Sequence, residues 1–143
     1  MNVKVLATSA ALALAPLLTG CGYNTMQANE EAVKAAWGDV ESAYQRRTDL
    51  IPNLVTVVKA YAKHERETLT AVTEARSRAG QVKLSAEKLD DAAALAQFQK
   101  AQAELGSSLA RLMVVVERYP ELKANESFRD LQTQLEGTEN RIN

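Results

Sequence analysis

The chain has 143 residues, and its 17 Lys and Arg nearly balance its 18 Asp and Glu, giving a formal net charge of -1 at pH 7. A chain this close to neutral, with only 5% aromatic residues, offers phosphate backbones no basic stripe, so we expect no nucleic-acid partner. The single Cys excludes an intrachain disulfide. The single His excludes the di-metal site of four-helix bundles, which takes a His from each of two helices. We therefore expect no cofactor.

The first twenty residues have the pattern of an export signal. Lys4 precedes an apolar run over residues 5–18, which is typical of a signal peptide. Those residues would span only about 21 Å as a helix, less than the ~30 Å core of a bilayer, so a permanent membrane-spanning helix is the weaker interpretation. The sequence Leu-Thr-Gly-Cys at residues 18–21 resembles the lipobox of bacterial lipoproteins, in which the Cys is acylated, for example with palmitate, and becomes the mature N-terminus.

Lipidated Cys21 is expected to hold the protein on a membrane, because two or more acyl chains anchor a protein stably whereas one binds only marginally. The rest of the chain would then lie on the extracytoplasmic side of the bacterial cell envelope. Gly22 follows the Cys, which slightly favours the outer membrane if the bacterium is Gram-negative. The alternative is an ordinary signal peptide or an uncleaved anchor with an incidental Cys.

The remaining chain is expected to be all-α, with a polar tether over residues 21–29 and a helical bundle domain over residues 30–143. Beyond the leader, Pro occurs only at positions 52 and 120, and no alternating run of strand length lies between them. Short corners make neighbouring helices antiparallel, so the predicted fold is an up-and-down bundle with coiled-coil-like seams. Apolar spacings of three and four predict helices over residues 30–48, 50–79, 85–119 and 126–143.

Side chains at the predicted corners suggest how these helices begin and end. Asp49 is expected to cap the second helix, with Pro52 in its first turn, where a missing N–H costs nothing. Gly80 suits a left-handed C-terminal cap. Ser85 and Asn125 are expected to cap the third and fourth helices.

The predicted helix lengths are unequal. At 1.5 Å per residue, the second and third helices would reach about 45 and 50 Å and the fourth only about 27 Å. We therefore expect a truncated fourth helix, from a natural truncation or a fragment, with exposed apolar surface and a tendency to self-associate. Residues 112–116 are apolar on more than one face, which predicts either a central helix or a partner surface.

Two long stretches resemble the LemA family. They are RRTDLIPNLVTVVKAYAKHE at residues 46–65, followed by TLTAVTEAR at 68–76, and ERYPELKANESF at 117–128, followed by LQTQLEGTEN at 131–140. The resemblance implies an antiparallel bundle of four long helices. The candidate interaction or structural residues on the first stretch are Arg46, Arg47, Asp49, Pro52, Asn53, Tyr61, His64 and Glu65.

Two functions fit this sequence, and neither is catalytic. Acylation would consume Cys21, and no Ser lies in a strand-to-helix elbow, so we expect no enzyme. The first hypothesis, which the LemA resemblance implies, is a lipid-anchored envelope scaffold that binds an unknown protein partner. The second is an envelope protein that binds a small anionic ligand or a metal near Arg46, Arg47, His64 and Glu65, with Glu136 or Glu139 completing a metal site. These residues could equally serve as helix caps and satisfied polar pairs.

Overall fold

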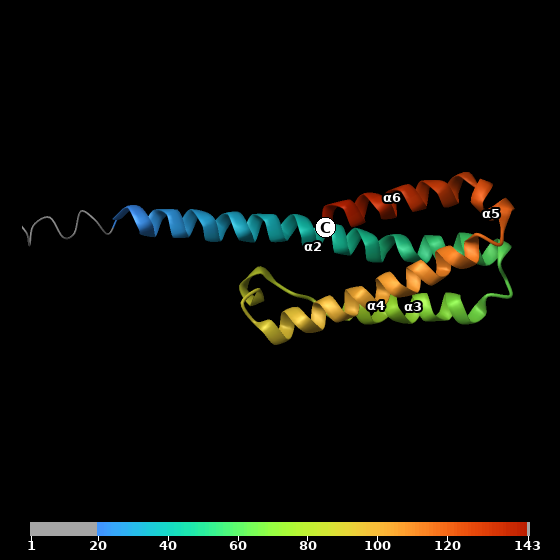
Figure 1. The fold of residues 1–143 in the computed structure, drawn as a ribbon, viewed down its shortest axis with the longest axis horizontal. Coiled ribbons are helices and arrows are strands. Elements are labelled where there is room, and N and C mark those ends of the chain that lie inside the picture. The colour runs from blue at the N-terminus through green and yellow to red at the C-terminus, as the bar shows by residue number, and fades with distance from the viewer. Residues whose placement is uncertain (1–19, 143) are drawn as a thin grey trace, which may run out of the picture. The chain divides into compact units, whose positions relative to one another are not determined.

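The computed structural model describes residues 20–142, with side chains from Tyr23 onward, and is drawn in Figure 1. The predicted leader lies outside the described residues apart from Gly20, and lipidation of Cys21 stays a prediction. Within the described range there is no strand, so the all-α prediction is confirmed. The elements are α2 Gly20–Tyr61, α3 Arg66–Gln81, the 3-10 turn η2 Ala86–Lys88, α4 Ala92–Val116, α5 Pro120–Ala124 and α6 Glu126–Ile142.

Residues 20–36 form a unit of their own at the start of α2. The predicted tether is helical, and the side chains of residues 23–36 are exposed apart from that of Lys34, which is half-buried. The Nζ of Lys34 forms an ion pair with Glu30 Oε1 at 2.9 Å, one turn away. Tyr23, Met26 and Val33 are large apolar side chains left in solvent.

The second unit begins at Trp37 and contains the bundle. The later part of α2 and helices α3, α4 and α6 run alternately in opposite directions, as the predicted up-and-down topology requires (Figure 1). Helices α3 and α4 make the most extensive contact between two helices, with the small buried residues Ala75 and Ala79 on α3. The core cluster consists of Ile51, Leu54, Val58, Ala62, Leu69, Val72, Ala75, Ala79, Leu105, Leu109, Leu112, Val116, Leu122, Phe128 and Leu135.

The first predicted corner is wrong. Helix α2 continues through residues 48–50 and keeps Pro52 in its interior. Asp49 caps nothing, because its Oδ1 accepts a hydrogen bond from Gln45 Nε2 at 2.9 Å, one turn back on the same helix. The chain turns instead at residues 62–65, which contain neither Gly nor Pro.

The predicted caps at Gly80 and Ser85 are wrong, and the predicted cap at Asn125 is confirmed. Gly80 lies inside α3, and no Gly in the described range has a positive φ. Ser85 makes no capping bond, whereas Asp91 caps α4 by accepting from Ala93 N at 3.0 Å and Ala94 N at 3.1 Å. Asn125 Oδ1 accepts from the backbone N–H of the third residue after it, at 3.0 Å, as predicted for the cap of the last helix.

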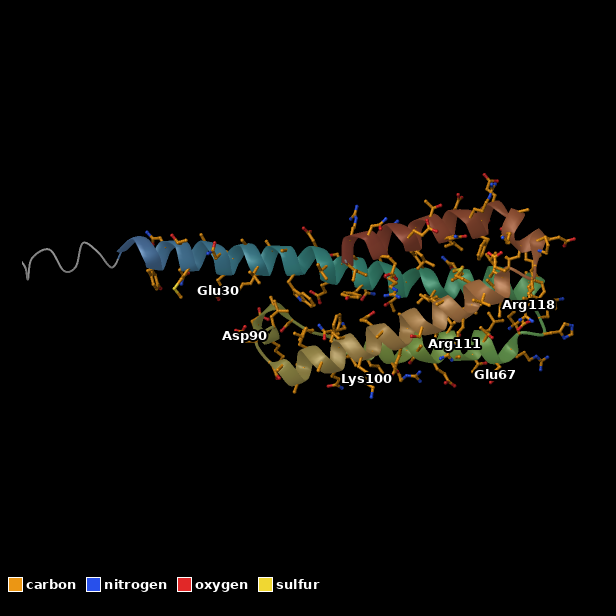
Figure 2. The ribbon with its side chains drawn as sticks, in the orientation of Figure 1. Glu30, Glu67, Asp90, Lys100, Arg111 and Arg118 are labelled. Atoms are coloured by element: carbon orange, nitrogen blue, oxygen red, sulfur yellow. The ribbon has the colours of Figure 1, made fainter. Side chains whose placement is uncertain are left out.

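Replacing Asp91 with Ala should lower the free energy of unfolding by about 1 kcal/mol, because two backbone N–H groups of α4 lose their acceptor. Asp90→Ala is the matched control, because Asp90, labelled in Figure 2, is a neighbouring exposed carboxylate. The capping bonds of α4 are made by Asp91 instead. Urea melts of the two variants measure the difference. Equal losses would show that α4 does not begin at Asp91.

The mismatch in helix length is smaller than predicted. Helices α3, α4 and α6 have 16, 25 and 17 residues, so α6 is about as long as α3 but shorter than α4. Within the apolar run at residues 112–116, Leu112, Val115 and Val116 are buried, and Val114 is the exposed member at 70%. The run therefore belongs mainly to the bundle interior. Between residues 20 and 142, no helix combines the length and the apolarity needed to cross a membrane.

Candidate functional site

A proline inside α2 frees a backbone acceptor, and a neighbouring helix supplies the donor. Pro52 has no N–H, so the carbonyl of Thr48, four residues earlier, lacks its usual helical partner. Arg76 on α3 donates from Nε to this carbonyl at 3.1 Å. Since Thr48 is buried, an unpaired carbonyl there would be costly. The proline and the arginine thus form one structural device that joins α2 to α3.

A buried guanidinium joins α2 to α6. Arg47 is only 5% exposed, and its Nη2 lies 2.9 Å from Glu139 Oε1. Gly106 on α4 makes room for it, because a Cβ at that position would lie 3.1 Å from the same nitrogen. Arg47 Nε has no hydrogen-bond partner in the described part of the chain. This ion pair therefore depends on a carboxylate whose own side chain is 43% exposed.

Arg46 points to a different surface and has a neutral partner. Its Nη2 donates to Gln134 Oε1 on α6 at 3.1 Å. A hollow of about 570 Å³ beside it is lined by Ser42, Ala43, Arg46, Gln134, Gly137, Thr138 and Arg141. No lining residue carries a carboxylate, so the charge of Arg46 is not neutralised there.

A polar network closes the end of the bundle where α2 turns into α3. Glu65 Oε1 accepts from Arg118 Nη2 at 2.9 Å and from the Tyr119 hydroxyl at 3.1 Å. Desolvation, followed by this hydrogen bond to Glu65, raises the pKa of Tyr119. Asn125 Nδ2 donates to the Tyr61 hydroxyl at 3.1 Å. Figure 2 shows Arg118 at the same end as Glu67, in the first turn of α3, with Asp90 at the other end.

A second hollow, of about 700 Å³, opens between α2 and α4, against the end of α3. Arg46 and Lys83 line it together with Glu41 and Asp49, so it has as many acidic as basic side chains. Phe98 forms part of its wall and stands edge-to-face with Tyr44 at 4.9 Å between ring centroids. Burial is the first cause that raises the pKa of Tyr44.

The structure does not gather the predicted site residues in one place. Arg46 and Arg47 lie in the middle of the bundle. Tyr61 lies at its end, fourteen residues or about 21 Å beyond Arg47 along α2, and Glu65 lies in the corner that follows. His64, Pro52 and Asn53 are exposed. Across residues 20–142, no group of three or more His, Cys, Asp or Glu side chains is close enough to hold a metal ion.

The comparisons identify the family. The family model for LemA matches residues 36–143, which begins one residue before the bundle unit. The chain belongs to the LemA family. Among curated proteins it is similar to magnetosome proteins MamQ 1 and MamQ 2 of Paramagnetospirillum magneticum strain AMB-1 and to MamQ of Magnetospirillum gryphiswaldense strain MSR-1. Each is 26% identical over 136 residues, covering 84% of this chain and 50% of the relative. The chain therefore spans about half the length of these relatives.

Most of the hydrogen bonds and ion pairs between helices described above join one of the LemA-like stretches to the other. Arg76, Arg118 and Tyr119 belong to those stretches and are not among the predicted site residues, whereas Asn125 is predicted only as a cap and Glu139 only as a metal ligand. The sequence alone does not indicate how these residues pair, because each partner lies on another helix. In this LemA protein, the matching residues mostly contact one another.

Proposed function

We propose that this LemA protein is a lipid-anchored helical scaffold of the bacterial cell envelope that binds protein partners without catalysing a reaction. Its bundle would stand on the extracytoplasmic side of the membrane, attached through Cys21. The observation that carries the proposal is the mutual pairing of the polar residues in the LemA-like stretches. A side chain that must hold two helices together is poorly suited to bind and release a substrate.

Polar contacts between helices occur at several places along the bundle. Arg76 joins α3 to α2, Arg47 joins α2 to α6, and Glu65 joins the α2–α3 corner to the end of α4. The contacts of Arg76 and Arg47 are buried or half-buried, whereas Arg118 is exposed. Polar contacts between helices favour one arrangement of the helices, which is what a docking scaffold requires. The ligand hypothesis has less support, because it needs Arg47 and Glu65 in one site.

Replacing Cys21 with Ser should abolish acyl labelling and signal cleavage, because the thiol is the proposed attachment point. Labelling cells with a palmitate analogue and comparing electrophoretic mobility measures both effects. Thr19→Ser is the matched control, since it changes a nearby hydroxyl residue and leaves the thiol. If the Cys21→Ser protein is labelled and processed like the original, the lipid anchor is disproved.

The scaffold and ligand hypotheses can be separated by thermal shift. Purified protein would be heated with Zn²⁺, Mg²⁺ or citrate, since a ligand present at 100 times its dissociation constant adds about 2.7 kcal/mol to stability. The scaffold proposal predicts no metal shift, and crosslinking in intact cells should capture the same protein partner repeatedly. A metal shift that disappears in both His64→Ala and Glu65→Gln would contradict it.

A further inference from the structure

The hollow between α2 and α6 has the features of an anion site. Helix α6 lies alongside α2 in Figure 1, and the Arg46 to Gln134 hydrogen bond joins the two helices at this hollow. Arg46 comes from α2 and Arg141 from α6, so two arginines from different helices line the same space. Gly137 leaves the wall open, because a Cβ there would meet nothing within 4 Å.

Both arginines keep hydrogen-bond donors available. Arg46 gives one N–H to a neutral amide oxygen, and a guanidinium has five such donors. Arg141 has no ion pair among residues 20–142, and its side chain is exposed. The nearby hydroxyls of Ser42 and Thr138 already donate to backbone carbonyls, at 2.8 and 2.7 Å. A ligand here would therefore be held by guanidinium groups, which favour phosphate and carboxylate through paired N–H donors.

We propose that Arg46 and Arg141 form a binding site for a phosphate monoester, either a free metabolite or a lipid headgroup. Two guanidinium charges match the nearly dianionic charge of a phosphate monoester near pH 7 better than a single carboxylate. The hollow of about 570 Å³ accommodates the phosphate together with part of its organic group. This site is independent of the proposed scaffold function and needs neither Arg47 nor His64.

The test is an NMR titration of the purified ¹⁵N-labelled full chain at constant ionic strength. The probes are glycerol 3-phosphate, dihexanoyl phosphatidic acid below its micelle concentration, and dihexanoyl phosphatidylglycerol, which carries a phosphodiester. Saturable shifts of the Gly137 amide and the Arg141 Nε–H are expected with both monoesters, and weaker ones with the diester. Tighter binding of phosphatidic acid would identify a lipid headgroup as the source, and equal binding a free metabolite.

Arg46→Gln and Arg141→Gln should each weaken monoester binding about tenfold or more, because each removes a charged donor. Arg129→Gln is the control, since it removes an exposed arginine of α6 that does not line the hollow. The inference is overturned if chloride at the same ionic strength reproduces the shifts, if neither monoester saturates them, or if both Gln variants bind as the parent does. If crosslinking in cells captures no protein partner but the monoesters still bind, only the scaffold proposal is contradicted.

Discussion

Pro52→Ala is expected to raise the free energy of unfolding by about 2 to 3 kcal/mol, since a proline inside a helix costs about 3 kcal/mol. The new N–H would pair with the Thr48 carbonyl, and the clash of the proline ring with that carbonyl would disappear. Asn53→Ala is the control, because Asn53 is the next residue on α2 and is equally exposed. Asn53→Ala should raise the free energy of unfolding by less than about 0.7 kcal/mol, through helix propensity. Unchanged or lower stability of Pro52→Ala would mean that a helix starts at Pro52.

The hydrogen bond from Arg76 to the Thr48 carbonyl predicts an energetic coupling between α2 and α3. Arg76→Met should cost about 1 to 3 kcal/mol in the parent protein, because it leaves the buried Thr48 carbonyl without a donor. In the Pro52→Ala background the cost should be much smaller, since the helix then satisfies that carbonyl itself. A double-mutant cycle from urea melts measures the difference. Additive effects would show that Arg76 does not compensate for the proline.

Glu139→Gln is expected to cost about 2 kcal/mol, because it leaves the buried Arg47 charge without its partner. Removing one member of a fully buried pair costs about 3 to 5 kcal/mol, and we expect less here because Glu139 is 43% exposed. Glu104→Gln is the matched control. Glu104 is also 43% exposed, but its partner Arg78 is 54% exposed, so the loss should stay below about 1 kcal/mol.

The two members of the buried pair should respond unequally. Arg47→Met removes the buried charge and fills much of its volume, so stability should change by less than about 1 kcal/mol. Chemical denaturation of Arg47→Met, Glu139→Gln and the double variant measures this asymmetry. If Glu139→Gln costs no more than Glu104→Gln, the contact between α2 and α6 does not hold the bundle together.

Helix faces could be predicted from the sequence. Leu105, Leu109 and Leu112 are buried as their spacing indicates, because a stripe is repeated over many turns and tolerates local exceptions. Helix boundaries could not be predicted equally well. Asp49 and Pro52 fit both a helix start and a helix interior, and the donor that makes the interior possible lies 28 residues away from Thr48. The real corner at residues 62–65 has no Gly or Pro to mark it.

The candidate site was less predictable than the fold. Arg47 and Glu139 were both identified as polar residues of interest, but their pairing depends on the packing of α2 against α6. Asp91 was missed as a cap because Ser85, six residues earlier, is also a favoured capping residue. Arg141 was missed because an exposed arginine near a helix end is ordinary until a second arginine lines the same hollow.

Helix α2 passes unbroken through Pro52, and this continuity brings the polar residues of the LemA-like stretches into contact with one another. The continuity can be measured as the distance between spin labels at Glu41 and Lys59, two exposed positions, in the Cys21→Ser background. They are five helical turns apart, so a continuous helix places them on one face about 27 Å apart. A corner at Asp49 would instead fold them against each other at the ~10 Å spacing of packed antiparallel helices. A continuous α2 predicts a distance near 27 Å, and a distance near 10 Å would contradict it.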